Sequence, residues 1–274
     1  MHVEEGTPVD GQRYDGGVDE RLVATPRYDS YYYARQSGGS LRSARQIVPF
    51  VADLVRPASV VDVGCGVGTW LSVFRENHVS DVLGLDGAYV DASALQIPND
   101  DFLPCDLRSP PPLDRRFDLA MSLEVAEHLP HDSSPAFVQY LVSLAPVVLF
   151  SAATPLQGGR GHQNERWQHE WAELFADQGY LAFDLVRPRF WNEAGVVWFY
   201  AQNTVIYASP ASTSLIPALH PARATHDLRS LSSLHPSLLS NLPVKSAARI
   251  LLRSSRRAVK RNRLVRKFAD AVGC

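Results

Sequence analysis

The 274-residue chain has little of what marks a disulfide-rich, zinc-binding or membrane-spanning protein. Its three cysteines, Cys65, Cys105 and Cys274, have neither the number of a disulfide framework nor the spacing of a zinc site. It has no uncharged apolar run of about 18 residues, so we expect no transmembrane helix. The acidic, polar first residues do not resemble a secretory signal. We therefore expect free thiols and a cytoplasmic setting.

Apolar residues make up 45% of the chain, which is ordinary for a globular protein and sufficient for a sizeable core. The net charge of −2 hides an uneven distribution, because residues 241–274 hold ten Lys and Arg residues and one acidic residue. The composition predicts four regions along the chain. They are a flexible arm (1–27), a folded domain (28–209), a linker with short turns (210–242) and a basic helical tail (243–274).

Strand-like and helix-like segments alternate through the central region, which predicts an α/β fold with a doubly wound, mostly parallel sheet and helices on both faces. The expected strands are 59–63, 81–86, 101–105, 117–122, 147–151, 181–186 and 204–208, and the expected helices include 40–55, 135–145 and a helix from Asn164 to Gly179. In such sheets ligands bind beyond the carboxyl ends of the strands.

A glycine-rich turn follows the first expected strand and allows two interpretations. A dinucleotide fingerprint requires Gly or Ala at the third position, where this chain has Thr69. The alternative has an acid, Asp62, two residues before the first of three alternating glycines, Gly64, Gly66 and Gly68. A carboxylate there would repel a pyrophosphate but could help to hold the α-ammonium group of a methionine moiety. The glycines would let the main chain approach the ligand closely.

Two further acids follow later strands of the expected sheet. Asp86 ends the second strand and can accept hydrogen bonds from two ribose hydroxyls, although acids at this position also serve NAD. Asp106 follows the third strand, where a methyltransferase would recognise the adenine amino group. Together with the turn, these acids favour S-adenosylmethionine over a dinucleotide.

Four segments resemble successive motifs of class I S-adenosylmethionine-dependent methyltransferases: Asp62–Gly68, Leu85–Asp86, Cys105–Leu107 and Phe117–His128. The resemblance spans about residues 28–208 and implies a Rossmann-like, seven-stranded sheet whose last strand is antiparallel. The stretches Phe150–Pro155 and Gly161–Glu165 also resemble a bacterial methyltransferase-domain subgroup of unassigned substrate. The candidate cofactor-binding residues are Asp62, Gly64, Gly66, Gly68, Asp86, Asp106, Leu107, Leu123 and Glu124.

Methyl transfer to an oxygen or nitrogen of high pKa benefits from a general base, most often His. His128 follows the fourth expected strand, and Glu127 could orient it by a hydrogen bond. Alternatively, the two residues only cap a short turn. A third interpretation is a divalent cation held by Glu124, Glu127 and His128 with His162, because E-x-x-E-H resembles metal-dependent RNA 2′-O-methyltransferases. We favour the base over the cation.

A second candidate base is His162, which lies just before an expected helix N-terminus, a position that keeps an imidazole neutral. It could equally be a loop histidine without a role. The segment 187–200 carries aromatic residues and two arginines between the last two expected strands. In this fold such an insertion lies over the acceptor site, although a simple hairpin core is equally consistent.

These observations predict an enzyme that O-methylates a sugar, a glycan or a secondary-metabolite small molecule. An RNA 2′-O-methyltransferase and an S-adenosylmethionine-binding protein without turnover are the alternatives. The basic tail fits a solvated helix, contact with anionic lipid at the inner membrane surface, or a polyanion. Nucleic acid is the least favoured partner, because no recognised RNA-binding module accompanies the charge.

Overall fold

The computed structural model describes residues 30–213 and 215–242, with side chains from residue 38 onward. The expected arm over 1–27 and the basic tail over 243–274 lie outside these residues. No helix within the described ranges is long and apolar enough to cross a membrane.

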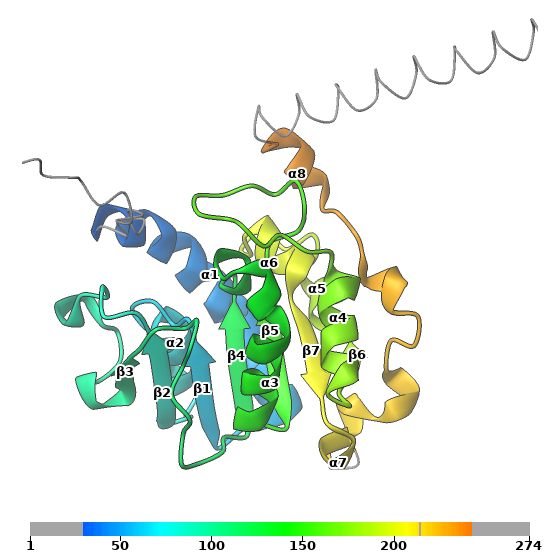
Figure 1. Ribbon diagram of the computed structural model, residues 1–274, viewed down its shortest axis with the longest axis horizontal. Coiled ribbons are helices and arrows are strands. Elements are labelled where there is room, and N and C mark those ends of the chain that lie inside the picture. The colour runs from blue at the N-terminus through cyan, green and yellow to red at the C-terminus, as the bar shows by residue number, and fades with distance from the viewer. Residues whose placement is uncertain (1–29, 214, 243–274) are drawn as a thin grey trace, which may run out of the picture.

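Seven strands form one sheet in the order β3-β2-β1-β4-β5-β7-β6 (Figure 1). β7 pairs antiparallel with β5 and β6, and the other pairings are parallel, which confirms the expected fold class. The strands are β1 (Ser59–Val63), β2 (Asp81–Asp86), β3 (Phe102–Pro104), β4 (Leu119–Leu123), β5 (Val147–Ser151), β6 (Leu181–Phe183) and β7 (Val205–Ala208).

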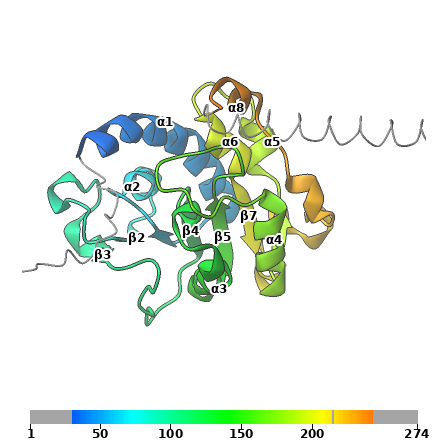
Figure 2. The same ribbon diagram turned by 45° about the horizontal axis from the view of Figure 1, so that its top comes forward.

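Helices cover both faces of the sheet, as Figure 2 shows. Successive strand residues point to opposite faces, so Val60 belongs to one buried cluster and Val61 to the other. The Val60 cluster includes residues of α1 (Ser30–Val55), α2 (Thr69–Glu76), α5 (Val186–Phe190) and α6 (Trp198–Asn203). The Val61 cluster includes residues of α3 (Ser134–Leu144) and α4 (Gln168–Asp177).

Several element boundaries differ from the sequence prediction. α1 begins at Ser30 and not at residue 40, β4 spans Leu119–Leu123 and not 117–122, and β3 is shortened to Phe102–Pro104. Two further differences have identifiable reasons. α4 begins at Gln168 and not at Asn164, because the Asn164 side chain bonds to the turn that follows β4 instead of capping the helix. β6 ends at Phe183, and the chain then enters α5 at Val186, where Arg187 bonds back to Asp184.

The segment 210–242 packs onto the domain through short helical turns, including α7 (Pro210–Thr213) and α8 (Pro236–Ser240). Its leucines Leu219, Leu231 and Leu238 are buried. Arg187, which is 3% exposed, links this segment to the domain by hydrogen bonds. Its guanidinium pairs with Asp184 and donates to the carbonyl oxygens of Gln202 and Leu231.

We expect Arg187→Met to lower the free energy of unfolding by about 3 kcal/mol, because it leaves buried carbonyl groups and Asp184 without their donor. Urea unfolding of the two proteins measures the difference. Arg189→Met, at an exposed position on the same helix, is the matched control and should change stability little. Equal effects of the two substitutions would contradict the assigned role of Arg187.

Candidate active site

The residues expected to bind a cofactor lie along the carboxyl edge of the sheet. Asp62 is next to the last residue of β1, Asp86 ends β2 and Leu123 ends β4. These three strands are neighbours in the sheet. The topology therefore brings together groups that are up to about 60 residues apart in sequence, as expected for a parallel sheet.

The glycine turn between β1 and α2 needs its glycines for two reasons. Gly64, Gly66 and Gly68 have φ angles of 94°, 54° and 78°, in the left-handed region that side chains disfavour. A Cβ at Gly64 would overlap the Val125 side chain, and one at Gly68 would lie 2.9 Å from Ile97 Cγ1. The turn is thus packed against the segment after β4, with its backbone close to the carboxyl edge.

Asp86 accepts three hydrogen bonds at this edge. Its Oδ2 accepts from the Gly66 N–H at 2.7 Å, and its Oδ1 accepts from the Gly87 N–H at 2.6 Å and the Tyr89 hydroxyl at 2.5 Å. Burial raises the pKa of Asp86 although these hydrogen bonds oppose the shift. Asp62 is 2% exposed, and burial followed by the charge of Asp86 raises its pKa well above the usual value.

Asp106 and Leu107 follow β3 at the outer side of the same edge. The Asp106 carboxylate is exposed and pairs with Arg108 at 2.6 Å, which lowers its pKa through the Arg108 side-chain hydrogen bond. Leu107 is partly buried against the Val61 cluster. Neither side chain is enclosed in the way that Asp62 and Asp86 are.

Glu124, directly after β4, has a left-handed backbone with φ 58°. Its carboxylate accepts from the Gln157 amide at 2.8 Å and the Asn203 amide at 3.0 Å. Burial raises its pKa, and these two amides oppose the shift. The hydrogen bonds connect the turn after β4 with the loop after β5 and with the end of α6.

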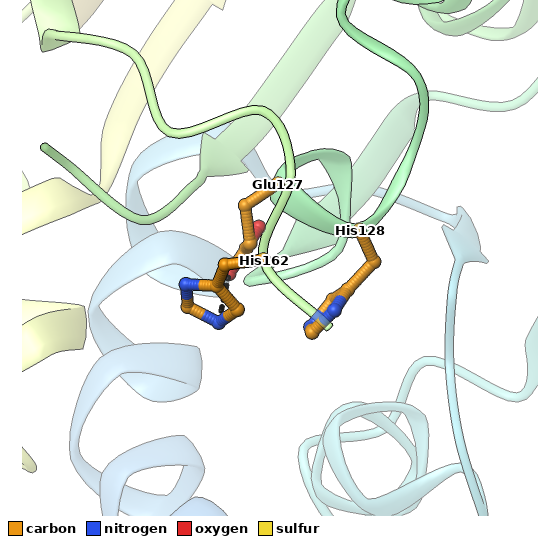
Figure 3. Close-up of side chains that lie close together, drawn as sticks. All are labelled: Glu127, His128 and His162. Atoms are coloured by element: carbon orange, nitrogen blue, oxygen red, sulfur yellow. Dashed lines mark ion pairs between the residues drawn. The ribbon is translucent and has the colours of Figure 1, made fainter. Parts of the chain in front are cut away.

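The Glu127 carboxylate points toward the His162 ring (Figure 3). Glu127 is 1% exposed, and its Oε1 lies 4.0 Å from His162 Nε2. The other carboxylate oxygen is buried without a hydrogen-bond partner. Burial, followed by the charge of Glu124, raises the pKa of Glu127 well above its usual value. On its other side His162 contacts Glu165, with 3.1 Å between Nδ1 and Oε1.

His128 packs against His162 with ring centroids 4.9 Å apart and an interplanar angle of 84°. Burial, followed by the charge of His162, lowers the pKa of His128 to about 4. His128 is therefore neutral at pH 7. The structure brings together the three predicted catalytic residues, Glu127, His128 and His162.

The loop that carries His162 is fixed to the turn that carries Glu127 and His128. The backbone N–H groups of Gln163 and Asn164 both donate to the Glu127 carbonyl oxygen, at 2.9 and 3.1 Å. The Asn164 side chain, 1% exposed, donates to the Ala126 carbonyl and the Ser134 hydroxyl. Asn164 therefore positions the two histidines relative to each other.

The same three residues could hold a cation. One ligand atom each from Glu127, His128 and His162 lies within 4.8 Å of the others. Ligands of one bound divalent ion lie about 3–4 Å apart, so a small closure would complete the group, and the unpartnered Glu127 oxygen suits a ligand. Glu124 is not part of this group, since Gln157 and Asn203 bond to its carboxylate.

Sequence reasoning missed the amide residues of the site. Gln157 and Asn203 carry no motif and become visible only when the sheet places the loop after β5 beside the end of α6. Asn164 was expected to cap a helix. Its position before an amphipathic stretch fits a cap equally well, so no sequence signal separated the two roles.

A family described as "Methyltransferase domain" matches residues 33–205. The chain belongs to this family. This methyltransferase is a class I enzyme that uses S-adenosylmethionine as the methyl donor. No curated protein matches the chain.

Solved structures share the fold of this methyltransferase. The aminopentose methyltransferase CalS10 of Micromonospora echinaspora, with bound S-adenosylmethionine, is 17% identical, with a TM-score of 0.51, and the match covers 66% of this chain and 97% of that one. Magnesium protoporphyrin IX methyltransferase of Synechocystis PCC 6803 is 19% identical, with a TM-score of 0.46, and the match covers 65% and 87% of the two chains.

We expect Asp86→Ala to weaken S-adenosylmethionine binding by roughly 10- to 100-fold, because it removes the buried carboxylate that is predicted to accept hydrogen bonds from the ribose hydroxyls. Isothermal titration measures the dissociation constant. Asp81→Ala, at the exposed opposite end of the same strand, is the control and should leave it unchanged. An unaltered constant in Asp86→Ala would remove Asp86 from the site.

We expect Asn164→Ala to raise the pKa of His128 from about 4 toward its ordinary value of 6.5, because release of the loop exposes the imidazole to water. Imidazole NMR of the labelled protein follows this titration without any acceptor. Asn241→Ala, at an exposed site in the C-terminal segment, should leave the titration unchanged. A His128 pKa that stays low in Asn164→Ala would contradict the positioning role.

Proposed function

We propose that this methyltransferase O-methylates a hydroxyl group of a sugar, a glycan or a secondary-metabolite small molecule, with His128 as the general base. The observation that carries the proposal is a neutral imidazole at the carboxyl edge, packed against a second histidine. A neutral imidazole can take the proton of a hydroxyl group as the oxygen becomes a nucleophile.

The chain's own residues fit the methyl donor at the same edge. S-adenosylmethionine supplies a methyl group activated by a sulfonium centre. Asp62 would attract its positively charged methionine end, and Asp86 would accept hydrogen bonds from the ribose. The bare backbone at Gly64–Gly68 would allow the close approach that side chains would block.

The neighbours of His128 would align it and exclude water. His162 is held between Glu127 and Glu165, so its ring is fixed where it supports the His128 ring edge to face. His128 would accept the hydroxyl proton while the acceptor oxygen forms its bond to the methyl carbon and the carbon–sulfur bond breaks. The products are the methyl ether and S-adenosylhomocysteine.

A second candidate is methyl transfer assisted by a divalent cation, favoured by the close approach of Glu127, His128 and His162. A cation held there would polarise a vicinal diol, the group that sugars and the 3′ end of RNA both carry. In that case His128 and His162 would bind the cation through neutral nitrogens, and His128 would not serve as the base.

We expect His128→Ala to lower the rate of methyl transfer by about 10²- to 10⁴-fold while leaving S-adenosylmethionine affinity unchanged. The assay follows radiolabelled methyl groups into a small-molecule extract and, separately, into RNA. His226→Ala, at an exposed position, is the control. Donor binding without transfer to any fraction would favour a protein without turnover, and label confined to RNA would overturn the small-molecule proposal.

The effects of EDTA and of pH on the rate of methyl transfer distinguish catalysis by a general base from catalysis by a bound cation. If His128 is the base, the rate should survive EDTA and should not fall between pH 8 and about pH 5, because His128 becomes protonated only near pH 4. Loss of transfer in EDTA, with recovery on addition of Mg²⁺ or Mn²⁺, would replace the base by the cation.

A further inference from the structure

A cavity of about 510 Å³ lies where α1, the segment between α5 and α6, and α8 meet. Its walls include Arg42 from α1, Trp191 and Trp198 from the two ends of the α5–α6 segment, and His235 and Ser237 at the start of α8. We refer to it as the Trp191–Trp198 cavity. Its volume falls within the range of small-molecule sites.

The two indole rings are only half-buried, yet their surroundings hold them in place. The Trp191 ring lies 4.9 Å from the His235 ring, and His235 Nε2 lies 2.7 Å from the Trp191 carbonyl oxygen. The Trp198 ring packs at 5.7 Å against Phe199. Rigid, partly exposed aromatic rings bind the apolar face of a ligand at a small entropic cost.

Polar groups of both signs line the rest of the cavity. Arg42 offers donors, Glu193 offers acceptors, and Asn192 offers both. The guanidinium and the carboxylate balance each other, so the cavity has no excess charge that would select an ionic ligand. A ligand that uses all of these groups must carry several neutral groups that both donate and accept hydrogen bonds.

Short hydrogen bonds link the cavity to the candidate active site. The His235 N–H donates to Gln202 Oε1 at 2.7 Å, and Gln202 Nε2 donates to Asn203 Oδ1 at 2.9 Å. Asn203 in turn donates to Glu124. Figure 1 and Figure 2 both place α5, α6 and α8 together at the carboxyl end of β4 and β5. The cavity therefore lies on the acceptor side of the sheet.

We propose that the Trp191–Trp198 cavity binds a sugar ring. A pyranose has an apolar C–H face that can stack on indole and a rim of hydroxyl groups that can bond to Arg42, Asn192 and Glu193. That this sugar is part of the methyl acceptor rests on the proposed function, whereas sugar binding itself does not. A flat aromatic ligand would use the indole rings but would leave the polar groups unpaired, at a cost.

Sugar binding can be measured on the full chain without turnover. The probes are the methyl glycosides of glucose, galactose, mannose and rhamnose and the disaccharides maltose and cellobiose, each titrated in the presence of S-adenosylhomocysteine. Saturation-transfer NMR and tryptophan fluorescence report binding. We expect millimolar binding of at least one probe, and no binding of any of them in this concentration range would overturn the proposal.

Substitutions of residues that line the Trp191–Trp198 cavity test whether the sugar binds there. Trp191→Ala and Trp198→Ala should each weaken binding about tenfold or more, while S-adenosylmethionine binding stays intact and shows that the domain is folded. Trp167→Phe changes a half-buried tryptophan outside the cavity lining and is the matched control. Sugar binding that survives both cavity substitutions would place the sugar elsewhere and contradict the proposal.

Glu193→Gln distinguishes the ligand class. A neutral sugar loses a charge-assisted hydrogen bond and should bind about fivefold more weakly. Tighter binding of a glucose 1-phosphate probe than of any neutral sugar, strengthened further in Glu193→Gln, would mean an anion site and overturn the proposal. Sugar that binds in the cavity but is never methylated would refute the claim that this sugar is part of the methyl acceptor and would leave the sugar-binding site standing.

Discussion

Two hydrogen bonds to one carbonyl oxygen organise the candidate catalytic centre. The Glu127 carbonyl receives the N–H groups of Gln163 and Asn164, so the turn after β4 and the loop after β5 share one anchor. These bonds hold together the segments that carry His128 and His162, whose rings lie 4.9 Å apart. The buried side chain of Asn164 reinforces the joint, and the low pKa of His128 follows from the enclosure that results.

The carboxyl edge concentrates buried acids. Burial raises the pKa of Asp62, Asp86, Glu124 and Glu127. The hydrogen-bond donors to Asp86 and Glu124 are backbone N–H groups, a tyrosine hydroxyl and two side-chain amides, none of which carries a positive charge. A cationic ligand would stabilise the ionised carboxylates of this edge, because it supplies the positive charge that their protein hydrogen-bond donors lack. The sulfonium donor of this family is such a ligand.

Most of the fold could be predicted because it depends on local patterns. β1, β2 and β5 have the predicted bounds, since each is a short apolar run between clear breaks in the pattern. The glycine turn could also be predicted from the sequence, because its left-handed backbone and its close packing both require glycine. The three catalytic candidates, Glu127, His128 and His162, lie close together in the structure, and their roles stay predictions.

What could not be predicted depends on contacts between distant segments. Asn203 and Gln157 bond to Glu124 across separations of 79 and 33 residues, and no spacing rule reaches that far. The segment 210–242 looked like a linker because it is rich in Ser and Pro, yet it packs onto the domain through three buried leucines while most of its other residues are exposed or half-buried. The composition of a segment indicates whether it can form turns and remain in contact with water. Whether it packs onto the domain depends on the apolar surface of the domain beside it, which composition does not reveal.

The guanidinium of Arg187 has a consequence for how the domain opens. It bonds at once to Asp184, beside β6, to the end of α6 and to Leu231 in the C-terminal segment. Because one buried side chain joins these three segments, none of them can unfold locally without breaking its bonds to Arg187. In hydrogen exchange they would behave as a single cooperative unit, so the end of α6 and the C-terminal segment would open only together with the sheet edge at β6.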